Sequence, residues 1–234
     1  MVALGNFLFQ HRNKLFPVFY VLLFLPSPSL TGNLGVIMIL GFLIAIAGQM
    51  VRVATIGLRY IIRGGRRRRV YADDLVTDGI FGHCRNPLYV GNILILVGLG
   101  VMANSLVFNV VAAPLFLFMY QAIVRAEEDF LTGKFGAAYG EYVANVNRWI
   151  PRLGGLRDTF GSMEFVWSRV VIREYTTTYI WLTGSVLLVM KNLAQVEDDT
   201  LYRAIWPWAA SALVALFTIY ITIRTLKIRG ILTA

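Results

Sequence analysis

The sequence predicts an all-α, polytopic integral membrane protein with about six transmembrane helices. Apolar residues make up 57% of the 234-residue chain and charged residues only 15%, whereas soluble domains carry about a quarter charged residues. Apolar runs close to the roughly 20 residues that cross a bilayer recur along the chain. Basic residues are concentrated in the polar segments between these runs, as the positive-inside rule requires.

Six runs are expected to span the membrane, and two of them form a close pair. In chain order the runs are 15–30, 34–54, 88–103, 106–124, 177–193 and 204–223. Only Asn104 and Ser105 separate the third run from the fourth, so these two are expected to form a helical hairpin. Pro114 is expected to kink the fourth helix, and Pro207 is expected in the first turn of the sixth, where proline is tolerated.

The loop charges predict that both termini lie in the cytoplasm. With that orientation only three of the 22 lysine and arginine residues fall outside the cytoplasmic segments. These are Arg52 within the second helix, and Lys191 and Arg203 on the opposite side. The net charge of +9 is therefore expected to set topology and to contact anionic lipid head groups rather than nucleic acid. The arginine run at 66–69 is the clearest such signal.

Two polar segments, about 59–87 and 125–176, are expected on the cytoplasmic side. Within the second, residues 163–172 are expected to form an amphipathic helix lying on the membrane surface. The chain has a single cysteine, Cys84, which excludes an intrachain disulfide. No metal site is predicted.

The first polar cluster, residues 75–91, ends where the third helix begins. Pro87 fits the first turn of that helix, whose N-terminus offers N–H groups and a positive dipole end to an anionic ligand. An ordinary capped helix entry explains the same residues equally well. Both interpretations stay open at this point.

The second polar cluster begins with Glu127 and Glu128, directly after the fourth apolar run. Acidic groups at a helix C-terminus oppose its dipole, at a cost of about 0.3–1 kcal/mol each. Their presence suggests that they hold a cation or a ligand hydroxyl, or that they form a salt bridge with Arg85 or Arg125. Because a hairpin returns both its ends to one membrane face, the two clusters are expected to form one composite site.

The two clusters together resemble the isoprenylcysteine carboxyl methyltransferase family, whose wider superfamily includes phospholipid N-methyltransferases. The resemblance rests on separated elements in the right order, namely Thr77-Asp-Gly-Ile-Phe81, Arg85-Asn-Pro-Leu-Tyr-Val-Gly91, Glu127-Glu128, Phe135-Gly136, Tyr139, Tyr142, Arg148 and Pro151. It covers roughly residues 70–152, the expected methyltransferase core. On either side lie residues 1–69, with the first membrane helices and a basic loop, and residues 153–234, with the interfacial helix and the last two membrane helices.

The resemblance implies an S-adenosylmethionine-dependent membrane methyltransferase. The cofactor would enter from the cytoplasm and a lipidic acceptor from the bilayer, most like isoprenylcysteine carboxyl O-methylation. Phospholipid N-methylation and small-thiol S-methylation stay open. The family's cofactor contacts correspond here to Val76, Phe81, Asn86, Pro87, Tyr89 and Glu127. Arg85 and Glu128 are added as expected cofactor contacts because they are charged.

Four charged residues are given individual roles. Glu127 is expected to hold the cofactor's ribose or amino group and Arg85 its carboxylate, and these two are the candidate catalytic residues. Arg52 and Arg125 are candidates for binding the acceptor. An arginine placed like Arg52 either faces a partner or cavity or extends to the interface.

Some positions depart from the family pattern or are ambiguous. Asn86 stands where the family usually has histidine, and an asparagine cannot titrate near neutral pH. Gly98 and Gly100 either contact the cofactor or simply allow neighbouring helices to approach. The NADPH-dependent membrane sterol reductases have a similar pattern, but they place aspartate where this chain has Asn92. A non-enzymatic lipid-binding protein with a degenerate site is the other alternative.

Overall fold

The structure, a computed structural model, describes residues 1–59, 72–196 and 199–233. Its helices are α1 (Val2–Leu22), α2 (Leu34–Leu58), η1 (Gly79–Gly82), α3 (Pro87–Met102), η2 (Phe108–Ala112), α4 (Ala113–Phe135), α5 (Ala137–Asn145), α6 (Leu156–Ser162), α7 (Trp167–Leu193) and α8 (Thr200–Ile228). No strand occurs in these ranges, which confirms the all-α prediction. The arginine run 66–69 lies outside the described residues.

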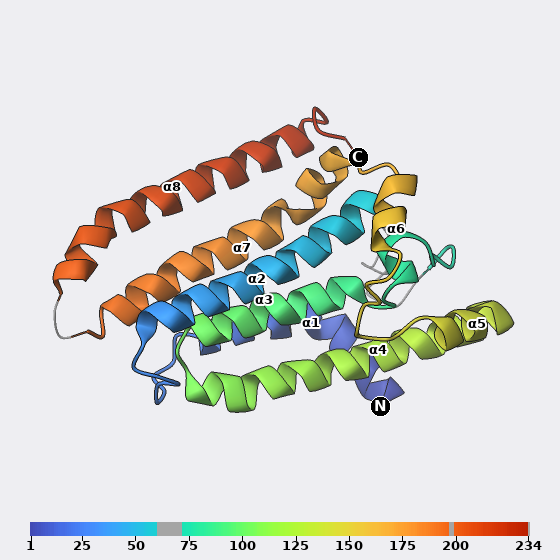
Figure 1. Ribbon diagram of the computed structural model, residues 1–234, viewed down its shortest axis with the longest axis horizontal. Helices are drawn as coiled ribbons and strands as arrows, with labels where there is room; N and C mark the ends of the chain where they lie inside the picture. The colour runs from blue at the N-terminus through green and yellow to red at the C-terminus, as the bar shows by residue number, and fades with distance from the viewer. Residues whose placement is uncertain (60–71, 197–198, 234) are drawn as a thin grey trace.

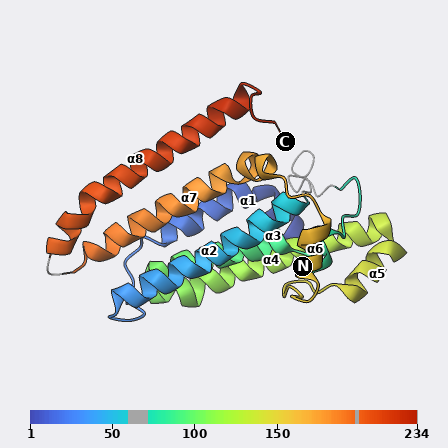
Figure 2. The same ribbon diagram turned by 45° about the horizontal axis from the view of Figure 1, so that its top comes forward.

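The long helices lie side by side, and the short helices α5 and α6 lie at one end of the bundle (Figure 1). Both chain ends, α5 and α6 lie toward that end, while the α1–α2 and α7–α8 connections lie at the other (Figures 1 and 2). α8 runs beside α7 at the edge of the bundle. The polar segments on which the predicted site depends are therefore collected at one end.

Three helices are long and apolar enough to cross a membrane, which agrees with an integral membrane protein. They are Leu34–Leu58, Phe108–Phe135 and Thr200–Ile228, and α3 is a shorter apolar helix. The predicted count of six spans is not confirmed. α1 and α7 contain charged residues, among them Arg12, Lys14 and Glu174, which lower their apolar character without ending the helix.

The predicted bounds of the first span are wrong at both ends. α1 begins at Val2 and ends at Leu22, so Pro26 and Pro28 lie in the segment that connects it to α2. Arginine and lysine are good helix formers, so Arg12 and Lys14 continue the helix although they do not belong in an apolar run. By contrast, α3 lies within one residue of its predicted bounds and has Pro87 at its start, as predicted.

The predicted surface helix at 163–172 is also wrong. Residues 163–166 are not helical, and Trp167 begins α7, which continues without interruption to Leu193. The fifth predicted span, 177–193, is thus only the second part of a longer helix. Pro207 also differs from its prediction, because it lies inside α8 rather than in its first turn.

The predicted hairpin is present, and its second arm is irregular near Pro114. The helical conformation resumes at Leu106 and contains the wide π turn η2 just before Pro114. Such π turns are local departures from the regular α-helical ladder, and proline, which lacks an N–H, cannot complete that ladder. Asn109 ties the turn to α3, because its Nδ2 donates to Gly100 O at 2.8 Å.

Glycines allow α2 and α3 to pack with their backbones in contact. A Cβ on Gly98 would lie 2.5 Å from Gly41 O and 2.6 Å from Ala45 N, and one on Gly48 would lie 2.6 Å from Gly91 O. A Cβ on Gly100 would meet the Phe108 ring at 2.6 Å. The structure thus shows these residues in helix packing, as small residues commonly are in membrane proteins.

We expect Gly98→Ala to destabilise the protein, because the new methyl group would meet the backbone of α2, which cannot move aside locally. Overpacking of this kind costs about 1–3 kcal/mol. Gly133→Ala in α4 is the matched control, since a Cβ added there would meet no atom within 4 Å and alanine favours a helix interior by about 0.5–1 kcal/mol. Thermal unfolding in detergent would measure both, and equal effects would contradict the prediction.

Candidate functional site

Glu127 and Glu128 lie inside α4, not beyond its end. The helix continues two turns further, to Phe135, so these carboxylates do not oppose a helix dipole as the sequence suggested. The apolar run ends near residue 124, but the helical conformation continues beyond it. The pair is nevertheless close to the polar end of the bundle, next to the start of α3.

The two arms of the hairpin bring Tyr89 and Glu127 together. Tyr89 lies in the first turn of α3, and its hydroxyl donates to Glu127 Oε1 at 2.6 Å. Hydrogen bonds to an ionised carboxylate are short and about twice as strong as neutral ones. This contact joins residues 38 positions apart, so the predicted meeting of the two clusters is confirmed.

Glu128 lies between two arginines. Arg85 Nη2 lies 3.1 Å from Glu128 Oε1, while Arg148 donates from Nε at 2.9 Å and from Nη2 at 2.6 Å to the two carboxylate oxygens. The predicted Arg85 salt bridge is therefore present, and Arg148 makes the bidentate contact that best matches a carboxylate. Two cations on one carboxylate leave the cluster with a local charge of about +1.

Arg85 also holds the end of α5. Its Nη1 donates to Val143 O at 2.9 Å and to Val146 O at 3.1 Å. These carbonyls belong to the last turn of α5 and to the residue after it, where carbonyls lack helical partners. The guanidinium thus connects the start of α3 to both α4 and α5.

The segment 83–86 pairs with the segment 147–152, and we call this pairing the clasp. Arg85 N donates to Asn147 O at 2.9 Å, and Arg152 N donates to His83 O at 3.0 Å. The Asn86 side chain donates to Arg148 O at 3.2 Å. The clasp fixes the segment from which the Arg148 side chain reaches Glu128.

The clasp also accounts for His83 and Asn86, which are both buried. His83 Nδ1 lies 2.7 Å from Arg152 O, and its Nε2 lies 2.8 Å from Thr159 Oγ1. His83 is therefore a buried residue of the clasp and not an exposed loop residue. Asn86 ends the segment that precedes α3. The side chains of His83 and Asn86 both form hydrogen bonds that hold the clasp together.

The remaining predicted cofactor contacts surround the same end of α3. Phe81 is buried in η1, and its carbonyl accepts a 2.8 Å hydrogen bond from the Tyr142 hydroxyl. Pro87 is buried at the start of α3, and Val76 is half-buried.

Tyr139 of α5 is a further motif residue near this cluster. Burial, and then the nearby Glu128 carboxylate, raises the pKa of Tyr139 to about 12, so this phenol is neutral at physiological pH.

Arg52 faces a partner, and that partner is Glu174 of α7. Arg52 Nη2 lies 2.6 Å from Glu174 Oε1, and its Nε donates to Oε2 at 2.8 Å. The two side chains are 11% and 4% exposed, so the pair is buried. Gln49 Nε2 also donates to Glu174 Oε2 at 3.1 Å. Of the two interpretations of Arg52, the structure supports a paired guanidinium.

A line of hydrogen bonds continues from this pair toward the hairpin. Arg52 Nη1 donates to Asn92 Oδ1, and Asn92 Nδ2 donates to the Tyr120 hydroxyl at 2.7 Å. The Tyr120 ring lies beside the Tyr89 ring, with centroids 4.8 Å apart. The buried ion pair is therefore connected through side chains to the Tyr89–Glu127 contact.

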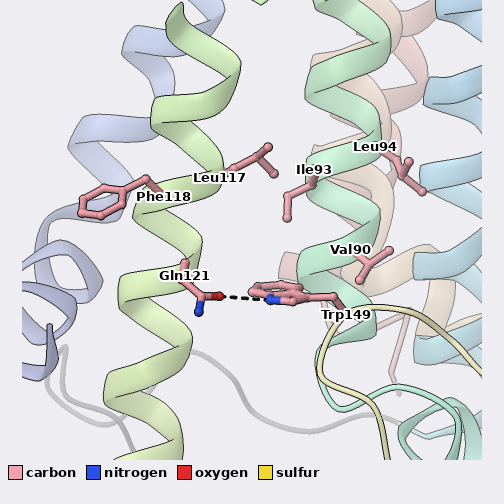
Figure 3. A pocket seen from close by; sticks show the side chains of 7 residues that line it. All are labelled: Val90, Ile93, Leu94, Leu117, Phe118, Gln121 and Trp149. Carbon is pink, nitrogen blue, oxygen red and sulfur yellow. Dashed lines mark hydrogen bonds between the residues drawn. The ribbon is translucent and has the colours of Figure 1, made fainter.

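An apolar cavity of about 440 Å³ lies between α3 and α4 (Figure 3). Ile93 of α3 and Leu117 of α4 point toward each other across it. Its polar end is closed by Trp149, whose Nε1 donates to Gln121 Oε1 at 3.0 Å. Arg125 lies one turn beyond Gln121, exposed, and its guanidinium makes no hydrogen bond or ion pair with the residues that the structure describes.

Sequence reasoning missed Glu174, Asn92 and Tyr120 as parts of this arrangement. Glu174 belongs to the polar segment 125–176, which was expected on the cytoplasmic side, and the pattern there did not indicate a partner for Arg52. A signal was present in the sequence: Arg52 lies within an apolar helix, and charges there commonly pair with an acidic residue of another helix. Among the described residues no group of three or more His, Cys, Asp or Glu residues could hold a metal.

Comparisons with known proteins agree on one family. The family model for phospholipid methyltransferases matches residues 34–138. The cobalt-zinc-cadmium resistance protein CzcN of Cupriavidus metallidurans is 30% identical over 87% of this chain and 91% of its own length. The nickel-cobalt-cadmium resistance protein NccN of Alcaligenes xylosoxydans is 30% identical over 59% of this chain and 62% of its own.

A further relative carries an enzymatic name. The protein-S-isoprenylcysteine O-methyltransferase of Schizosaccharomyces pombe is 38% identical over 33% of this chain and 33% of its own length. No solved structure matches the chain.

Proposed function

Because this chain belongs to the membrane methyltransferase family that includes the phospholipid and isoprenylcysteine methyltransferases, we propose that it transfers a methyl group from S-adenosylmethionine to a lipidic acceptor. The observation that carries the proposal is the contact of Tyr89 with Glu127, beside the Arg85–Glu128–Arg148 cluster. These residues come from the family motifs, and they meet where the apolar helices end. A water-soluble cofactor and a membrane-embedded acceptor can both reach such a boundary.

The chemistry of the polar groups fits this cofactor. S-adenosylmethionine has hydroxyl and amino groups that can donate hydrogen bonds to a carboxylate of the protein. It also has a carboxylate of its own, which a cationic side chain can bind. Glu127 offers the carboxylate, and the Arg85–Glu128–Arg148 cluster offers an excess of positive charge. Tyr89 fixes the position of the Glu127 carboxylate through its 2.6 Å hydrogen bond.

The cofactor supplies an activated sulfonium methyl group, so the protein mainly has to bind and orient the two reactants. Proximity and orientation supply about 7–11 kcal/mol of a reaction barrier. Arg85 contributes by fixing α3, α4 and α5 relative to one another. Asn86, whose amide donates to Arg148 O, holds the clasp and takes no proton.

An anionic acceptor group suits this site better than a protonated amine. A carboxylate needs no general base, whereas an amine must lose a proton first. Asn86 cannot accept that proton, and His83 is engaged on both ring nitrogens. We therefore propose carboxyl O-methylation of an isoprenylcysteine-like acceptor as the activity, with phospholipid N-methylation and small-thiol S-methylation as alternatives.

We also propose that the site faces the cytoplasm together with both chain ends. The two ends and the described parts of the polar segments lie toward the same end of the bundle (Figure 1), and in the sequence most basic residues belong to the polar segments. Basic side chains there would also contact anionic lipid head groups.

Cofactor binding by the purified protein in detergent tests the proposal. Calorimetry is expected to show binding of S-adenosylmethionine and no binding of NADPH. Binding of NADPH alone would support a reductase, and binding of neither would support a lipid-binding protein without this activity. Incubation with methyl-labelled cofactor and total membranes, followed by fractionation, would show which class of acceptor becomes labelled.

A further inference from the structure

The segment that follows α5 carries two apolar side chains that are largely exposed. Ile150 is 75% exposed and Leu153 is 76% exposed, and both belong to the polar segment 125–176. Single exposed apolar residues are common on protein surfaces, so the position of these two relative to the membrane decides what they do. The neighbouring Trp149 gives that position.

Trp149 lies at the level where the apolar part of α4 ends. Its Nε1 donates to Gln121 Oε1 at 3.0 Å (Figure 3), and Gln121 is three residues before Val124, the last apolar residue before Arg125. Three residues of α-helix cover roughly 4.5 Å, at about 1.5 Å each. This distance places Trp149 at the membrane–water boundary, where tryptophan is enriched in membrane proteins.

Ile150 lies in the same boundary layer. It is bonded to Trp149, so the two Cα atoms are about 3.8 Å apart, whereas the layer between hydrocarbon and water is roughly 5–8 Å deep on each side. Insertion of an exposed isoleucine there is favourable, because its apolar surface leaves water. Leu153 follows directly after the exposed Arg152, and residues 147–157 contain no acidic side chain that would oppose an approach to lipid phosphates.

The same segment is connected to the candidate cofactor site through the clasp. Arg148 Nη2 lies 2.6 Å from Glu128 Oε2, and the buried Cys84 thiol donates to the carbonyls of Arg148 and Trp149 at 3.5 and 3.6 Å. The residues that precede Ile150 are thus held by the clasp. A membrane contact that fixes Ile150 therefore also restrains Arg148.

We propose that Trp149, Ile150 and Leu153 form an interfacial anchor, which inserts into the boundary layer of the bilayer and holds the clasp against it. The partner of this surface is the lipid bilayer around the protein. The proposal goes beyond the proposed function, because it assigns a membrane contact to a segment outside the long helices. It also makes the Arg148–Glu128 contact dependent on the membrane.

Spin labels on single introduced cysteines test the depth of the anchor in nanodiscs of phosphatidylcholine and phosphatidylglycerol. The buried Cys84 stays in place, and the unsubstituted protein gives the background signal. At Ile150→Cys and Leu153→Cys we expect relaxation by oxygen, which enters lipid, to exceed relaxation by a water-soluble nickel chelate. This ratio should be at least threefold higher than at Ala138→Cys, the matched control, since Ala138 is exposed on α5, which extends beyond the polar end of the bundle (Figure 1). Equal ratios at the three positions would overturn the proposal.

Hydrogen exchange tests whether the clasp depends on the anchor. In nanodiscs, Ile150→Ser combined with Leu153→Ser is expected to speed exchange of the Arg85 amide, which donates to Asn147 O, at least threefold. Ile150→Leu keeps an apolar side chain and should keep the protection. Ile231→Ser should keep it too, because Ile231 is 65% exposed but lies beyond α8. Unchanged exchange in the double variant would overturn the link between the anchor and the clasp.

The effect on cofactor binding rests on the proposed function. Because Arg148 belongs to the charge cluster beside Glu127, the double serine variant is expected to bind S-adenosylmethionine at least threefold more weakly than the unsubstituted protein in nanodiscs. Equal affinities would overturn the link between the anchor and the cofactor site. If the unsubstituted protein binds no S-adenosylmethionine, the proposed function fails, while the depth and exchange measurements still decide whether the anchor exists.

Discussion

Replacing Glu127 by alanine is expected to weaken S-adenosylmethionine binding by about 10- to 100-fold. Hydrogen bonds to a charged group contribute about 1.5–3 kcal/mol, and each 1.4 kcal/mol changes an affinity tenfold. The substitution also removes the acceptor of the Tyr89 hydroxyl, which lies 2.6 Å from Glu127 Oε1. Calorimetry on the purified protein measures the effect.

Neighbouring substitutions separate the role of Glu127 from a general effect of charge. Asp129→Ala removes an exposed carboxylate two residues along α4 and should leave the affinity within twofold. Tyr89→Phe keeps the ring and removes only the hydroxyl, so it should lower the affinity less than Glu127→Ala does. If Glu127→Ala binds the cofactor as tightly as Asp129→Ala, Glu127 has no part in the cofactor site.

Replacing Glu174 by alanine is expected to destabilise the protein by about 3–5 kcal/mol, the usual cost of leaving one buried charge without its partner. Arg52 and Glu174 are 11% and 4% exposed, and their closest atoms lie 2.6 Å apart. The Arg52 guanidinium would then be left largely buried without the carboxylate that it contacts. Thermal or denaturant unfolding in detergent measures the loss.

An exposed ion pair in the same chain provides the matched control. Arg203 and Asp199 are 78% and 59% exposed at 2.7 Å, and such pairs contribute about 0–1 kcal/mol. Asp199→Ala should therefore have little effect. The double substitution Arg52→Met with Glu174→Met should recover much of the loss, since it leaves no unpaired charge. If Glu174→Ala is no worse than Asp199→Ala, the buried pair does not stabilise the fold.

The hairpin and its composite site could be predicted from the sequence. Two apolar runs separated only by Asn104 and Ser105 are expected to form two antiparallel helices. Tyr89 near the start of the first and Glu127 near the end of the second are then expected at the same end of the hairpin. Pro87 marked the start of α3 to within one residue. These predictions succeeded because they depend on local chain geometry and on the length of apolar runs.

The partners of the charged residues could not be predicted in the same way. Hydropathy records where a helix is apolar, but not where its hydrogen-bonded ladder ends, so α1 and α7 proved longer than their apolar parts. Glu174 and Arg52 are 122 residues apart, and only the packing of α7 against α2 shows that they meet. Arg148 was recognised as part of a motif, but its contact with Glu128 depends on the clasp.

The burial of Arg52 beside Glu174 has a consequence for biosynthesis. A ribosome makes α2 long before α7, so Arg52 must enter the membrane or wait at its surface with no acidic partner yet translated. An arginine at the centre of an inserting helix is opposed by about 2.5–3.5 kcal/mol, so we expect α2 to insert with its Arg52 end near the interface. A chain that ends before α7 would contain Arg52 but not its partner Glu174. We expect quality-control proteases to recognise such a chain.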